Sequence, residues 1–447
     1  MNEKLSDAMN EIRDEYIVDA GKSRPRKKVY WFSAVAAALA VVLIWHAIAN
    51  PIVTAKAISR ADYSTWTACK ADQVRADRDQ LAEFFISTMA QVLSGNSGEN
   101  EAFSPMNLYM ALAITAELSG GDSQILALLG ADSLETLRSQ ANNLWRATYR
   151  DGNNPCLLAN SLWLDNDLSY AQETMDTLAE TYYTSVYRGN FGSAMTDHAI
   201  SAWLNGQTGN LLKDSADGID LSDETVFALY ATIYFQAKWQ DEFSAANNTK
   251  DVFHSPSGDI TCTYMNKNKI QGLYYWGETF GAITLPLKDG NQMWLILPDE
   301  GRSPEELLSD PDFASTLFRQ AYDVDAEKNS KAMFINLSLP KFDIRSSGDL
   351  KADLMELGVT DAFDPSTANF SAIYSGDDPV WLTAVNQATR VAIDEKGVTA
   401  ASYIEIPGAG AAAPPDEMID FILDRPFLFV VTNHLGLPLF AGVVNEP

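Results

Sequence analysis

No charged residue occurs between Val29 and Ala55, and this run divides the chain into two unequal parts. Its centre, Trp31 to Ile48, is apolar on all sides, whereas a helix on the surface of a soluble domain is apolar along one stripe. About 20 such residues suffice to cross the hydrocarbon core of a bilayer. We therefore predict a transmembrane segment over residues 29–53, with a polar tail over 1–28 before it and a linker over 54–70 after it.

The flanks of this segment predict its orientation. Four basic residues precede it directly, and basic flanks favour the cytoplasmic side, so we expect a cytoplasmic tail and an exported remainder. These basic residues are Arg24, Arg26, Lys27 and Lys28. The long tail favours a retained signal anchor, which would leave a single-pass protein in the cell membrane. The alternative is a signal peptide cleaved after Ala49, since Ala47-Ile48-Ala49 has the small-x-small form, and the protein would then be secreted.

Charge and composition exclude several classes of function. Asp and Glu number 60 against 32 Lys and Arg, a net charge of -28, which disfavours binding to nucleic acid. Cys69, Cys156 and Cys262 do not stand at metal-ligand spacing, so we expect no metal site and no cofactor. The chain contains no Walker loop, dinucleotide fingerprint or nucleophile elbow, so we expect a protein that is not an enzyme.

The order of periodic patterns after residue 70 predicts the fold class. Helical spacing comes first, over residues 72–93, 107–118 and 172–187. Strand-like segments rich in β-branched and aromatic residues come later, over residues 225–236, 281–287, 292–297, 334–339 and 427–432. No internal repeat and no long linker divides residues 71–447, so we predict one large α+β domain.

The segment Gly397–Pro415 combines two kinds of pattern. Small residues and three prolines dominate it, which is typical of an exposed functional loop or a disordered one. Its first half alternates like a strand, with one set formed by Val398, Ala400, Ser402, Ile404 and Ile406. Periodicity alone fits equally well an edge strand followed by a flexible tip and a loop that could become a buried strand.

Short motifs in a fixed order run along residues 71–447. Near the C-terminus these are Glu395-Lys396-Gly397 with Ala400-Ala401, the run from Phe421 to Phe429, and Leu439 to Asn445. Earlier motifs are Phe103-Ser104-Pro105, Ala159-Asn160, Trp203 with Thr208, Tyr234-Phe235, Lys238-Trp239 and Leu339-Pro340-Lys341-Phe342. In type and order these motifs resemble those of the serpin family. With its N-terminal membrane segment, the chain is similar to a bacterial-type member of that family.

The resemblance implies a fold of three β-sheets and about nine helices, with an exposed reactive loop over about 395–420. It also implies suicide inhibition of serine proteases by a monomer without a cofactor. A protease cleaves the loop and forms an acyl-enzyme. The cut loop then inserts into the main sheet and distorts the protease before deacylation. Such a native state is held by kinetics rather than by equilibrium.

The resemblance also assigns site residues. The hinge comprises Glu395, Lys396, Gly397, Val398, Thr399, Ala400, Ala401 and Ser402. The family count places the cleaved bond at Ala411–Ala412, with Gly410–Ala411 and Ala412–Ala413 left open by the repeated alanines. An alanine before the bond suits proteases with small specificity pockets, of elastase-like or subtilisin-like character.

A polar shutter beneath the sheet falls at Ser104, Asn107, Ala231 and Gln387, where Ala231 and Gln387 replace the usual Asn and His. We therefore expect a rearranged shutter network. Pro407 is unusual for a strand that must insert into a sheet, because proline has no main-chain N–H to donate. A non-inhibitory binding or chaperone protein of the same fold is the alternative function.

Overall fold

The computed structural model describes residues 56–65, 78–95, 98–310, 329–374, 379–398 and 415–447, together with Val74 and Phe313. All of them belong to one compact unit, residues 51–447. None of the helices within these ranges is long and apolar enough to cross a membrane. The transmembrane segment predicted over 29–53 lies outside the described residues.

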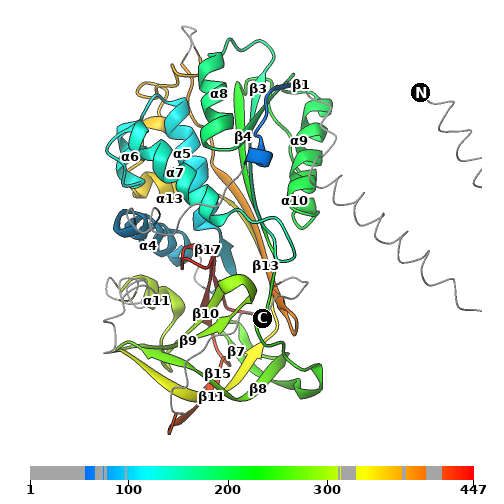
Figure 1. Ribbon diagram of the computed structural model, residues 1–447, viewed down its shortest axis with the longest axis vertical. Coiled ribbons are helices and arrows are strands. Elements are labelled where there is room, and N and C mark those ends of the chain that lie inside the picture. Colours follow the sequence, from blue (N-terminus) through cyan, green and yellow to red (C-terminus); the bar gives the residue numbers. More distant parts are fainter. Residues whose placement is uncertain are drawn as a thin grey trace, which may run out of the picture. The chain divides into compact units, whose positions relative to one another are not determined.

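The first of two four-stranded sheets borders the candidate functional site described below. Its strand order is β1-β4-β3-β5. The bounds are Lys56–Ser59 for β1, Thr184–Gly189 for β4, Cys156–Asp165 for β3 and Phe227–Phe235 for β5. Alternate residues of β3 face opposite sides, as the strand period requires. Leu162 packs into the main core, while Trp163 packs into a second cluster with helix α9, Ala194–Gln207. Figure 1 shows α9 alongside this sheet.

A second four-stranded sheet lies beside the first, in the order β12-β13-β14-β6. The bounds are Asp343–Asp349 for β12, Asn386–Asp394 for β13, Gly397–Val398 for β14 and Ala237–Lys238 for β6. Only Gln236 separates β5 from β6, so the chain passes directly from one sheet to the other. The sequence predicted β5 nearly to its ends, as residues 225–236.

A nine-stranded sheet contains most of the remaining strands. Its path is β15-β11-β8-β9-β10-β16-β17-β2, and β7 pairs with β8. The bounds are Met418–Ile422 for β15, Ser330–Pro340 for β11, Gly258–Trp276 for β8, Phe280–Pro286 for β9, Gln292–Pro298 for β10, Phe427–Thr432 for β16, Pro438–Val444 for β17, Glu101–Phe103 for β2 and Thr249–Ser255 for β7. The later strands predicted from β-branched and aromatic runs are confirmed as β9, β10, β11 and β16.

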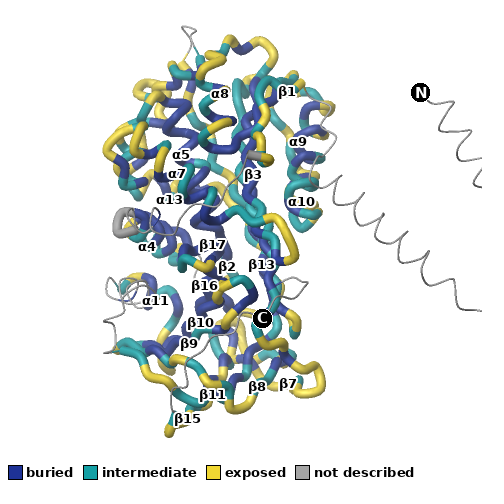
Figure 2. The backbone as a smooth tube through the Cα atoms, viewed as in Figure 1, coloured by how far each residue is buried: buried dark blue, intermediate teal, exposed yellow. Residues whose placement is uncertain are grey.

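The described residues contain nine α-helices. Their bounds are α4 Arg78–Ser94, α5 Pro105–Leu118, α6 Ser123–Leu128, α7 Leu134–Thr148, α8 Gln172–Thr181, α9 as above, α10 Lys213–Asp217, α11 Pro304–Leu308 and α13 Lys351–Glu356. Helix α5 is buried along nearly its whole length (Figure 2). Ser104 caps its N-terminus and Pro105 occupies its first turn, an arrangement that suits a helix start. The expected α+β fold with three sheets and about nine helices is confirmed.

The helix predicted over residues 172–187 is too long. Helix α8 ends at Thr181, and Tyr183 adopts a positive φ of 51°, a conformation that ends helices. The residues that follow form β4, which pairs in parallel with β3. Pairing within the sheet overrides the helical spacing of the apolar residues, because that spacing also fits a short buried strand.

Candidate functional site

The described part of the predicted hinge, residues 395–398, lies where β13 turns into β14. Strand β14 runs back antiparallel to β13, with Gly397 opposite Asp394 and Val398 opposite Ile393. On its other side β14 pairs with β6, with Gly397 opposite Lys238 and Val398 opposite Ala237. Val398 is buried. Two residues of the predicted reactive loop are therefore already paired between two strands.

Gly397 fits this position because the main chain approaches closely there. Its φ is +154°, and a Cβ at this residue would collide with the carbonyl oxygen of Ala237 and lie 2.5 Å from the Cα of Lys238. The turn before it is fixed by Asp394, whose Oδ1 accepts hydrogen bonds from the main-chain N–H of Lys396 at 2.8 Å and of Gly397 at 3.2 Å. The predicted pivot is thus a tightly held glycine.

Glu395 fastens the turn to neighbouring strands. Lys341 forms an ion pair with its Oε1 at 2.5 Å, and Asn248 Nδ2 donates to the same oxygen at 2.5 Å. The hydrogen bond from Lys341, followed by that from Asn248, lowers the pKa of Glu395 from 4.5 to about 2. Trp239 adds a hydrogen bond from Nε1 to the carbonyl of Asp394 at 2.8 Å. The sequence pattern marked Trp239 and Lys341 as family motifs but did not reveal this pairing, because the partners lie far apart in the chain.

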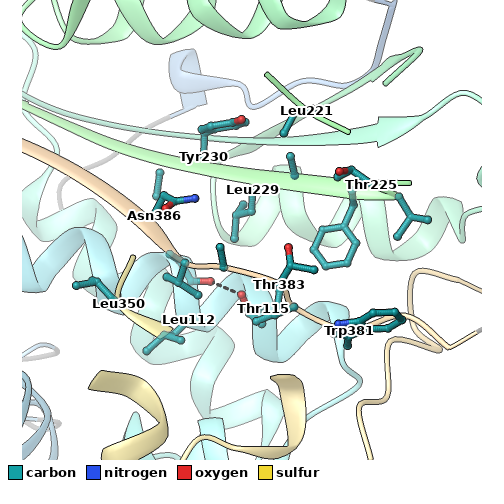
Figure 3. Close-up of a pocket in the computed structure, with 18 of the residues that line it drawn as sticks. Leu112, Thr115, Leu221, Thr225, Leu229, Tyr230, Leu350, Trp381, Thr383 and Asn386 are labelled. Atoms are coloured by element: carbon teal, nitrogen blue, oxygen red, sulfur yellow. Dashed lines mark hydrogen bonds between the residues drawn. The ribbon is translucent and has the colours of Figure 1, made fainter. Parts of the chain in front are cut away.

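Beyond β14, no strand among the described residues joins the two four-stranded sheets. In this part of the chain, β5 pairs with β3 on one side only, and β13 pairs along its length with β12. Between β5 and the residues that lead into β13 lies a cavity of about 420 Å³. Figure 3 shows side chains from α5, β5 and residues 379–387 pointing into this space. Its labelled lining residues include Leu112, Thr115, Leu229, Trp381 and Thr383.

The four predicted shutter residues come together at the start of α5. Gln387 Oε1 accepts from the N–H of Ser104 at 2.8 Å, and Gln387 Nε2 donates to the carbonyl of Ser104 at 3.1 Å. Asn107 Nδ2 donates to the carbonyl of Ala231 at 2.8 Å. Ser104 Oγ caps α5 by accepting from the N–H of Asn107 at 3.1 Å. Helix α5 is therefore tied to both sides of the opening, to β5 through Asn107 and to β13 through Gln387.

The remaining predicted site residues lie outside the described residues. These are the hinge residues Thr399, Ala400, Ala401 and Ser402 and the predicted bond Ala411–Ala412. The chain is described again from Pro415, and β15 follows at Met418 beside β11. No group of three or more His, Cys, Asp or Glu side chains in the described part of the chain is arranged to hold a metal ion.

Comparison with known proteins gives the same assignment over most of the chain. Residues 79–447 match the family described as Serpin (serine protease inhibitor). Alpha-1-antiproteinase S of Cavia porcellus is 28% identical over 377 residues, which cover 81% of this chain and 89% of that protein. Putative serpin-Z12 of Oryza sativa subsp. japonica is 27% identical over 386 residues, with coverage of 81% and 89%.

Solved structures agree with the sequence relatives. The native state of the thermophilic serpin tengpin superimposes with a TM-score of 0.72 at 25% identity, and the match covers 88% of this chain and all of that one. The latent state of the same protein gives a TM-score of 0.68 at 24% identity. The family match spans well over half of the chain and includes every residue of the hinge and the shutter. The chain therefore belongs to the serpin family of serine protease inhibitors.

Proposed function

We propose that this protein is an extracytoplasmic suicide inhibitor of serine proteases. A protease would attack the loop between Val398 and Pro415, and the cut loop would then insert as a new strand between β5 and β13. The observation that carries the proposal is the position of β14. This two-residue strand already lies between β13 and β6, at the end of an opening that is filled by no further strand from the described ranges.

The pairing of the strands beside the opening supports insertion. Among the described residues, β5 has no strand partner on the side that faces the opening, and β13 has only β14 there. An inserted strand would supply main-chain hydrogen bonds to both edges, each worth about 1 kcal/mol. It would also place Ala400, Ser402 and Ile404 on the inward side in register with buried Val398.

The shutter supports a barrier to that insertion. Asn107 and Gln387 join α5 to β5 and to β13, so widening the opening strains or breaks at least one of these contacts. Ser104 and Asn107 are buried, which makes each contact harder to lose, since an unsatisfied buried polar group costs about 1–3 kcal/mol. A shutter of Asn107 and Gln387 would thus take the place of the family's usual Asn and His.

The finer parts of the proposal concern target and location. We propose cleavage at Ala411–Ala412 by proteases with small specificity pockets, of elastase-like or subtilisin-like character. We also propose that residues 29–53 anchor a bacterial-type, monomeric protein with its inhibitory domain outside the cell. Cleavage after Ala49 would instead release the same domain.

The test is to incubate the protein with an elastase-like serine protease and to separate the products by denaturing electrophoresis. We expect a covalent adduct that survives denaturation. Ala400→Arg should abolish the adduct while the loop is still cut, because residue 400 falls on the inward side of the inserted strand, where a guanidinium would have to be buried. Ala401→Arg is the matched control, since residue 401 falls on the other side of the strand by alternation, and it should keep the adduct. Cleavage of the unmodified protein without any adduct would refute inhibition and favour the non-inhibitory alternative.

A further inference from the structure

Residues 56–65 lie before the part of the chain that matches the family, yet they belong to the folded domain. The family match begins at residue 79, whereas β1 pairs antiparallel with β4. Lys56 lies opposite Arg188, Ala57 opposite Tyr187 and Ser59 opposite Val186. These residues fall within the linker predicted over 54–70, because the four-residue strand carries no pattern strong enough to indicate a partner.

Both faces of β1 are covered, as expected of an integrated strand. Ala57 packs against the cluster that contains Trp163 and helix α9. The next residue, Ile58, packs against the main core on the opposite face. After the strand, the main-chain N–H of Ala61 donates to Ser185 Oγ at 3.3 Å. In Figure 1 β1 lies at the edge of the sheet beside β4.

An aromatic stack continues this attachment beyond the strand. Tyr63 begins a short 3-10 helix, Tyr63–Thr65, and its ring stacks on two residues at the end of α7 and just after it. The ring centroids lie 5.7 Å from Trp145 and 5.6 Å from Tyr149, with interplanar angles of 18° and 6°. Tyr63 also stacks on Tyr183, next to the start of β4, at 6.2 Å. Residues 56–65 therefore connect the outer edge of the sheet to α7.

The position of this connection relates it to loop insertion. Strand β1 is one edge of the sheet β1-β4-β3-β5, and β5, which faces the opening, is the other edge. A new strand beside β5 needs about 4.8 Å of width, so this sheet must move relative to β13 and the helices beneath. A displacement of that size from α7 separates the Tyr63 ring from Trp145 and Tyr149, whereas Tyr183 adjoins β4 and moves with the sheet.

We propose that residues 56–65 form a strap that holds the outer edge of the sheet to α7 and thereby slows insertion of the reactive loop. The inference rests on the proposed function, because it concerns the rate of the insertion step. It adds to that function a control element outside the family domain. Tyr63 acts as a positioning residue here, since it contacts neither the loop nor the protease.

The test measures how fast the uncut full-length chain converts on warming to a form that resists urea. Tyr63→Ala should accelerate this conversion about tenfold, because two to three aromatic contacts are lost. Tyr63→Phe keeps the ring and should convert at the original rate, as should Ser64→Ala at the exposed neighbouring residue. Ala57→Pro, which disrupts the β1 pairing instead, should reproduce the acceleration if Tyr63→Ala fails to fold.

Two results would overturn the strap. One is equal conversion rates for Tyr63→Ala and Ser64→Ala, including no conversion in either. The other is an equal drop in the melting temperature of the intact and cleaved forms of Tyr63→Ala, which indicates a purely structural role. The proposed function fails separately. If the original protein forms no protease adduct but Tyr63→Ala still accelerates conversion, inhibition is wrong and the strap stands.

Discussion

The two ends of the opening between β5 and β13 are built differently. At the hinge end a strand is in place, because β14 pairs with β13 and with β6 and Glu395 is fastened by Lys341 and Asn248. At the other end no described strand joins the sheets, and a cavity of about 420 Å³ lies above α5. Trp381, which lines that cavity, is 38% exposed.

Under the proposed mechanism, this difference gives insertion of the loop a direction. At the hinge end, Gly397 and Val398 are already paired with β13 and β6. Further loop residues can therefore add in register without a new nucleation step. The cavity end offers the edge of β5, which is unpaired among the described residues, and a lining of mixed apolar and polar side chains. An added strand would gain hydrogen bonds and burial there. Contacts at the hinge end should therefore control the stability of the intact protein. Contacts at α5 should control how easily β5 and β13 move apart.

The largest effect is expected at Gly397. Gly397→Ala should lower the free energy of unfolding of the intact protein by about 3 kcal/mol, because the new Cβ collides with the main chain of β6. Chemical denaturation measures the change. Gly348→Ala on β12 is the control, since a Cβ there meets nothing within 4 Å, and it should change stability by less than about 0.5 kcal/mol. Equal effects of the two variants would show that the hinge end is not tightly held.

The ion pair between Glu395 and Lys341 predicts that the free energy of unfolding depends on pH, with an effect of intermediate size. The pKa of Glu395 is lowered in the folded protein, so its contribution is present above its ordinary value of 4.5 and is lost as the pH falls toward 2. Glu395→Gln should cost about 2 kcal/mol at neutral pH, and this cost should shrink within that window.

Unfolding curves at several pH values measure the difference between Glu395→Gln and the unmodified protein. Glu306→Gln is the matched control, because Glu306 forms an ion pair with Arg302 that is exposed and distant from the hinge sequence. Its effect should stay below about 0.5 kcal/mol at every pH. A Glu395→Gln difference that does not change with pH would contradict the assigned ion pair.

The smallest effect on stability is expected at the cavity end. Asn107→Ala removes the hydrogen bond between α5 and Ala231 and should destabilise the intact form by about 1 kcal/mol while it speeds loop insertion. Stopped-flow fluorescence after protease addition measures that rate. Thr115→Val is the control. Thr115 lines the same cavity from the same helix, but its hydroxyl donates within α5, to the carbonyl of Ala111. If both variants insert at the same rate, Asn107 does not hold the sheet closed.

Sequence reasoning predicted the fold, and it named several residues that the structure brings together at the candidate site, because the family motifs are local. Gly397 and Val398 stand in one short run, and Ser104 and Asn107 stand one helical turn apart at the start of α5. Gln387 and Ala231 could be placed by counting from nearby motifs, and the structure brings both to the start of α5.

The features that escaped prediction depend on contacts between distant segments. The partners of Glu395 are Lys341, which lies between β11 and β12, and Asn248, which directly precedes β7. No residue pattern predicts that these residues meet. Residues 182–187 repeat apolar side chains at a spacing that suits a helix or a strand, and only pairing with β3 decides between them. The strap over 56–65 is short, and its pairing depends on an edge of β4 that the sequence did not predict as a strand.

The melting temperature of the protein before and after a single cut between Ala401 and Pro415 tests the central claim most directly. If the native chain stops short of its most stable fold, the cut loop completes the sheet, and the nicked protein should melt well above the intact one. Nicked protein that melts at or below the temperature of the intact protein would contradict stored folding energy, and with it inhibition by loop insertion.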